Sequence, residues 1–118
     1  MNYKIIKKRN KTYLEVTQAI TCESDILDII GACLSTDITR IVLRKNVISK
    51  EFINLKTGLA GLVLQKLMNY QIKVSAIIED RNSIQGRFKE LMYELDKNSN
   101  FRIFDNNLDA ENWIMKFN

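Results

Sequence analysis

After an N-terminal hairpin, the chain alternates between short apolar runs and segments with helical periodicity, and this order limits the folds that it can adopt. The hairpin predicts an antiparallel strand pair, because Asn10 at its turn tolerates the positive φ angle that a tight connection needs. The alternation that follows predicts parallel strands joined by right-handed helical crossovers. We expect five strands, near residues 3–8, 12–17, 41–43, 72–78 and 101–104.

Apolar residues recur at helical spacing between these strands. Ser24 is the expected N-cap of the first helix, and Asn82 with Gln85 forms a capping-box-like start for a later one. Asn106 or Asn107 is the expected cap of the last helix. The apolar stripes of these three helices contain Ile26, Ile29, Ile30, Cys33 and Leu34; Ile84, Phe88, Leu91, Met92 and Leu95; and Ala110, Trp113, Ile114 and Phe117.

The pattern therefore predicts an α/β fold, with a mixed, mostly parallel five-stranded sheet and helices on both faces. The run from Ile41 to Leu43 is apolar at every position, which is typical of a central strand covered on both sides. We expect a single domain over residues 1–118. The predicted core contains Ile41, Leu43, Leu59, Val63, Val74, Ile77, Phe88, Leu91, Phe104, Trp113 and Ile114.

The composition narrows the possible functions. The chain has 118 residues, 46% of them hydrophobic, with no histidine and two cysteines outside any CxxC pair, so we expect no metal site and no cofactor. Without histidine the commonest general base is missing, and we expect no enzymatic activity. Its apolar runs are too short to span a membrane, and its start does not resemble a signal peptide, so we expect a cytoplasmic protein.

The segment from Phe52 to Tyr70 is the most distinctive part of the chain. In one unbroken helix, Lys56 would point into an apolar stripe, so we expect a break there. The pattern predicts a short turn from about Ser49 and then a helix starting near Lys56 or Thr57, with Asn54 or Thr57 as its cap. We expect Gly61 to serve close packing of this helix.

A helix start that follows a parallel strand predicts a binding site, because its free amides favour anions and ligands of open α/β sheets bind at the carboxyl ends of the strands. The alternative is that these residues serve only capping and packing. We expect a protein partner or a small anionic ligand, and whether the domain forms a homodimer is left open. The candidate binding residues are Lys45, Ser49, Lys56, Thr57, Gly58 and Asp80.

Two other functions compete with this hypothesis. The basic hairpin, which contains Lys4, Lys7, Lys8, Arg9 and Lys11, could bind nucleic acid, although its lysines are also typical of a protected sheet edge. Tyr3 and Tyr13 are the only aromatic residues near the hairpin that could stack on nucleic-acid bases. A hydrolase or transferase would have to use Glu79 and Asp80 with Lys56, and a solvated loop is the simpler interpretation.

Three stretches resemble one bacterial family over essentially the whole chain: LKTGLAGLVLQKLMNY, the YE at positions 93–94, and DAENWI at 109–114. This is the domain-of-unknown-function 4180 family, which has no established activity. Its members usually carry a Gly-Asp-Phe-Ser type loop after the fourth strand. This chain has residues 79–83 there and keeps only the aspartate, Asp80, and a serine.

More distantly, the architecture and the stretch from Lys56 to Leu64 resemble the STAS domains of anti-sigma factor antagonists and sulfate transporters. The antagonists carry a phosphorylated serine in an Asp-Ser-Ser-Gly-Leu motif at a helix start. Thr57, Gly58 and Leu59 fall on its last three positions, while Leu55 replaces the aspartate. The resemblance makes Thr57 a candidate phosphorylation site and the fold STAS-like.

Overall fold

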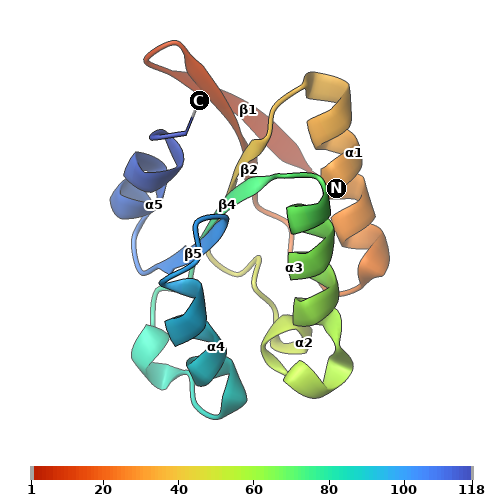
Figure 1. Ribbon diagram of the computed structural model, residues 1–118, viewed down its shortest axis with the longest axis vertical. Coiled ribbons are helices and arrows are strands. Elements are labelled where there is room, and N and C mark those ends of the chain that lie inside the picture. Colours follow the sequence, from red (N-terminus) through yellow and green to blue (C-terminus); the bar gives the residue numbers. More distant parts are fainter. Residues whose placement is uncertain (1, 118) are drawn as a thin grey trace.

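The computed structural model describes residues 2–117, whose five strands form one mixed sheet with helices on both faces (Figure 1). The strands lie in the order β1-β2-β3-β4-β5; β1 is antiparallel to β2 and the other neighbours are parallel, so the predicted fold class is confirmed. The strands are β1 (Tyr3–Lys8), β2 (Lys11–Val16), β3 (Arg40–Leu43), β4 (Lys73–Ile77) and β5 (Phe101–Phe104). The helices are α1 (Glu23–Thr36), α2 (Lys50–Ile53), α3 (Leu59–Asn69), α4 (Arg87–Leu95) and α5 (Asn107–Ile114), with 3-10 turns η1 (Leu55–Thr57) and η2 (Arg81–Ser83).

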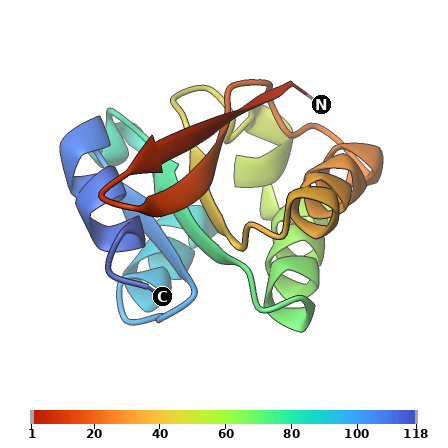
Figure 2. The same cartoon turned by 90° about the horizontal axis from the view of Figure 1, so that it is seen from above.

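The sheet separates two layers of helices, with α1 and α3 on one side and α5 on the other (Figure 2). Successive side chains of a strand point to opposite faces of the sheet and pack in different layers. Ile41 and Leu43 of β3 pack toward α1 and α3, whereas Val42 packs toward α5. α4 contributes Phe88 to the same core as α1 and α3. The first layer therefore holds most of the buried apolar surface.

The layer on the α5 side is smaller. Its buried residues are Tyr13, Val42, Ile77, Ala110 and Ile114. Ser75 is also buried on this face, and its hydroxyl donates a 2.8 Å hydrogen bond to the carbonyl of Ala110. Three residues expected in the core, Leu91, Phe104 and Trp113, are only partly buried. Trp113 packs at the margin of this layer, with its ring 6.0 Å from that of Phe104.

Two predicted helix starts are wrong. α1 is capped at Cys22 and not at Ser24, and the carboxylate of Asp25 accepts a 2.9 Å hydrogen bond from the amide of Thr21. The proposed capping box of Asn82 and Gln85 is absent, because the chain forms η2 there and α4 begins only after Gly86. Gly86 has φ 77° and ψ −153°, a conformation that only glycine adopts readily.

The cap of the last helix and the break before α3 are confirmed. Asn106 accepts a hydrogen bond from the amide of Asp109 at 2.8 Å. Asn54 caps η1, and the chain then turns at Gly58, with φ 75°, before α3 begins at Leu59. Gly58 is thus the residue that lets a 3-10 turn be followed directly by a helix in a new direction.

The expectation that Gly61 serves close packing is wrong. It is exposed, and a Cβ atom added to it would meet nothing within 4 Å. We therefore expect Gly61→Ala to raise the free energy of unfolding by about 0.5–1 kcal/mol, since alanine is the better helix former. Urea unfolding measures this change. Gly58→Ala is the matched comparison and should destabilise because of its positive φ; a destabilising Gly61→Ala would contradict the open surroundings of this position.

Glu111 of α5 forms hydrogen bonds that connect the β1–β2 hairpin to the last helix. Its carboxylate accepts a 2.5 Å hydrogen bond from the hydroxyl of Tyr13 and a 2.9 Å hydrogen bond from Nζ of Lys8. The Tyr13 hydrogen bond, followed by the Lys8 contacts, lowers the pKa of Glu111 below its ordinary value. The deprotonated form is therefore the one that the fold favours.

This arrangement predicts a loss of stability in acid. Because the pKa of Glu111 is lower in the folded state, its contribution is fully present above the unfolded-state value near pH 4 and is lost as the pH falls through the folded-state value. We expect Glu111→Gln to flatten the dependence of unfolding free energy on pH in this acid range. Urea titrations at a series of pH values test this, with Glu90→Gln as the control; equal slopes for Glu111→Gln and wild type would contradict it.

Candidate functional site

The loops that follow β3 and β4 leave the sheet at its carboxyl edge and enclose two adjoining hollows. Ile53 lines both. The first, which we call the basic hollow, has a volume of about 480 Å³. Its lining residues are Ile53, Asn54, Leu55, Lys56, Gln85, Arg87 and Phe88.

The basic hollow combines two cationic side chains with an apolar floor. Lys56 comes from η1 and Arg87 from the first turn of α4, and neither forms an ion pair with another residue in 2–117. Within the same range no side chain caps the start of α4, so its first amides add to the positive potential. Among residues 2–117, no carboxylate lines this hollow. Its chemistry therefore favours an anion that also carries apolar surface.

The second, which we call the mixed hollow, has a volume of about 260 Å³ and carries charges of both signs. Lys45 lines it together with Glu79 and Asp80. The structure thus brings Lys45 and Asp80 to one place. This is the proximity expected for loops that follow two neighbouring parallel strands. Two adjacent carboxylates make this hollow less suited to an anion than the basic hollow.

A third hollow, of about 360 Å³, surrounds the start of α3 and contains Thr57 and Gly58. Glu23 and Glu51 also line it, so two carboxylates oppose the positive end of the helix. The hydroxyl of Thr57 accepts a 3.2 Å hydrogen bond from the amide of Leu59 and lies 2.7 Å from the carbonyl oxygen of Glu51. These contacts give Thr57 a capping role, and its phosphorylation stays a prediction.

The six residues predicted as one site therefore fall in different surroundings. Lys56 lines the basic hollow, Lys45 and Asp80 line the mixed hollow, and Thr57 and Gly58 line the third. Ser49 lines none of these three; its hydroxyl donates to the carbonyl of Ile20 at 2.5 Å and accepts from the amide of Phe52 at 3.2 Å. Glu79 and Asp80 also do not share a hollow with Lys56.

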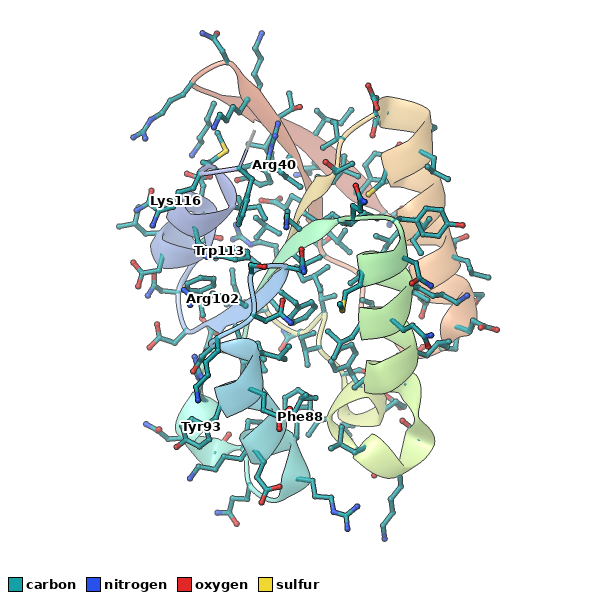
Figure 3. The ribbon with its side chains drawn as sticks, in the orientation of Figure 1. Arg40, Phe88, Tyr93, Arg102, Trp113 and Lys116 are labelled. Atoms are coloured by element: carbon teal, nitrogen blue, oxygen red, sulfur yellow. The ribbon has the colours of Figure 1, made fainter. Side chains whose placement is uncertain are left out.

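Hydrogen bonds and packing hold the walls of the basic hollow in place. Arg81 in η2 donates a 2.8 Å hydrogen bond to the carbonyl of Ile103 and a 2.9 Å hydrogen bond to the carboxylate of Asp96. These contacts fix the loop before α4 against β5 and the end of α4. The Phe88 ring points inward from α4 and meets the Phe52 ring edge-on, 6.0 Å away (Figure 3).

Of the residues that line the basic hollow, the site predicted from the sequence contained only Lys56. It missed Ile53, Asn54, Leu55, Gln85, Arg87 and Phe88. The predicted helix start at Asn82 placed Gln85 inside the first turn and left Arg87 without a special position. Gly86 was the available signal, because a glycine just before an arginine and an apolar stripe is compatible with a break immediately before a helix.

The basic hairpin offers little for stacking on nucleic-acid bases. Tyr13 is buried and hydrogen-bonded to Glu111, so its ring is not available at the surface. Lys8 is paired with Glu111, and Lys11 donates a 2.8 Å hydrogen bond to the carbonyl of Met115. Tyr3 is the exposed aromatic residue of the pair named from the sequence.

Residues 2–117 contain no cluster of three or more His, Cys, Asp or Glu side chains that could hold a metal ion. Over the same residues, none of the helices has both the length and the apolar character needed to cross a membrane.

The fold and its hollows define an α/β domain whose parallel strands deliver loops to one edge of the sheet. The chain belongs to the family described as Domain of unknown function (DUF4180), whose model matches residues 8–114. No curated protein and no solved structure matches the chain. The resemblance to STAS domains stays a prediction.

Proposed function

We propose that this protein is a binding module without turnover of its own, and that it binds a small anionic ligand with an apolar body in the basic hollow. The observation that carries the proposal is the pairing of Lys56 and Arg87, both without a carboxylate partner in 2–117, across one hollow. The amides at the uncapped start of α4 add a second source of attraction for an anion.

The size and lining of the basic hollow support a small molecule. Its volume of about 480 Å³ lies within the range of roughly 300–1,000 Å³ that is typical of small-ligand sites. Ile53, Leu55 and Phe88 provide apolar contacts, while the amide groups of Asn54 and Gln85 provide hydrogen-bonding atoms at the rim. A phosphate or carboxylate attached to a ring fits this combination of charge and apolar surface.

Phenyl phosphate is a suitable probe, because it combines a dianion with one aromatic ring. We expect it to bind more tightly than inorganic phosphate, which lacks the ring, and benzyl alcohol, which lacks the charge. Lys56→Glu and Arg87→Glu should each lower the affinity at least about tenfold, equivalent to ~1.4 kcal/mol. Both residues are exposed, so the fold should survive either substitution.

Isothermal titration calorimetry measures these affinities, and Lys66→Glu on α3 is the matched control for an equal change in net charge. Equal losses for Lys66→Glu and Lys56→Glu would show a general charge effect and would contradict the proposed site. A Lys45→Glu variant that loses binding while Arg87→Glu retains it would place the site in the mixed hollow instead.

A further inference from the structure

The outer side of β1 is a second surface, separate from the basic hollow. β1 is an edge strand, hydrogen-bonded to β2 on one side and without a neighbouring strand on the other in the described sheet. Five of its six residues are exposed. Backbone groups along such an edge are free to pair with another extended segment.

Apolar side chains gather beside this edge. Tyr3 and Ile5 stand opposite Val16 and Leu14 in the register of β1 and β2, and therefore point to the face of the sheet that α1 covers. They remain 39% and 53% exposed. If the lysines of β1 only protected the edge from aggregation, large apolar side chains would not have to remain exposed beside them.

α1 also carries exposed apolar side chains. Leu27 and Leu34 lie two turns apart on one side of the helix and are 50% and 65% exposed. Ala32, on the opposite flank, is buried, and α1 packs beside α3. The leucines lie on the other flank of α1, and α1 lies nearer to the hairpin than α3 does (Figure 2). We call Tyr3, Ile5, Leu27 and Leu34 the edge patch.

The positive charge of β1 indicates which kind of extended segment can pair with this edge. The strand carries Lys4, Lys7 and Lys8, and of these only Lys8 has a carboxylate partner in 2–117. Glu15, which stands opposite Lys4, is paired with Arg44 at 3.2 Å. A second copy of β1 would bring like charges together, whereas an acidic strand would neutralise them.

We propose that the β1 edge binds an extended acidic segment of a partner protein as an added strand of the sheet. Its apolar side chains contact the edge patch, and its carboxylates pair with Lys4 on the opposite face of the sheet and with Lys7, which follows Ile5 on the same face. Since neighbouring residues of a strand point to opposite faces, the segment alternates apolar and acidic residues beside positions 3–6 and carries a further acidic residue beside Lys7. This proposal does not depend on the function of the basic hollow.

A synthetic peptide that matches β1 in length, with valine and glutamate alternating and a further glutamate in place of the valine beside Lys7, tests the proposal with two-dimensional NMR of the full chain. We expect amide shifts in β1 and near Leu27 and Leu34. Lys4→Glu combined with Lys7→Glu should weaken this peptide at least about tenfold and should create binding of the matching valine–lysine peptide. Ile5→Lys should also weaken binding, whereas Leu108→Lys, an exposed apolar residue of α5, should not.

Five results would overturn the proposal. Shifts confined to the basic hollow, or loss of peptide binding in Lys56→Glu, would place the acidic peptide elsewhere. Equal binding of the valine–lysine peptide to the wild type would remove the charge argument. Tighter binding of an oligothymidylate at the same amides would assign the hairpin to nucleic acid. A dimer in analytical ultracentrifugation that Ile5→Lys dissociates would make a second copy the occupant.

Discussion

Phe52→Ala should destabilise the protein by about 3–5 kcal/mol, because this ring is fully buried where α2, α3 and α4 meet. Its edge-on contact with Phe88 at 6.0 Å would be lost, and the cavity left behind would lie beside Phe88, which lines the basic hollow. Chemical denaturation measures the change in the free energy of unfolding. The same substitution should weaken phenyl phosphate binding, since Phe88 is one wall of the hollow.

Tyr93→Ala is the matched control for Phe52→Ala, because it removes an aromatic ring that points outward from α4 and is 61% exposed (Figure 3). We expect it to change stability by less than about 0.5 kcal/mol. Similar losses for the two variants would mean that α2 and α4 do not share a core.

Ile114→Ala should lower stability by about 2–5 kcal/mol. Ile114 is fully buried and belongs to the small core on the α5 side, where few other side chains can move in to fill a cavity. Thermal and urea unfolding both report the loss. Leu108→Ala on the same helix is the control, since Leu108 is 67% exposed; an Ile114→Ala variant as stable as this control would show that α5 is not docked on the sheet.

The sequence predicted the succession of strands and helices along the chain and the helices on both faces of the sheet, because these depend on periodicity, which is a local property. Val42 lies between Ile41 and Leu43, and its burial on the α5 face follows from an apolar run that must be covered on both sides. Residue type likewise predicted Asn106 or Asn107 as the cap of α5, and the structure shows that it is Asn106.

Features that depend on the space around a residue could not be predicted in this way. Gly61 looked like a site of close approach, but in the fold its face of α3 is open to solvent. Trp113 has the apolar spacing of a core residue, yet it lies at the margin of its layer. In both cases the sequence indicates the face on which a residue lies, but not how far the neighbouring element extends over that face.

The candidate site, too, could be predicted only in part from the sequence. Lys56 was identified because it interrupts an apolar stripe, whereas Arg87 has no such local signal. Only the fold brings the two together, through loops that follow different strands. The helix start at Thr57, which seemed the better anion site, is opposed by Glu23 and Glu51 from other elements.

The most direct test of the basic hollow is a map of amide chemical shifts on addition of phenyl phosphate to the full chain. We expect the largest shifts at residues 53–56 and 85–88, with smaller ones elsewhere, and we expect them to disappear in the combined Lys56→Glu and Arg87→Glu variant. Shifts centred on Thr57 and Gly58, on Lys45 and Asp80, or on the β1 hairpin would contradict the account.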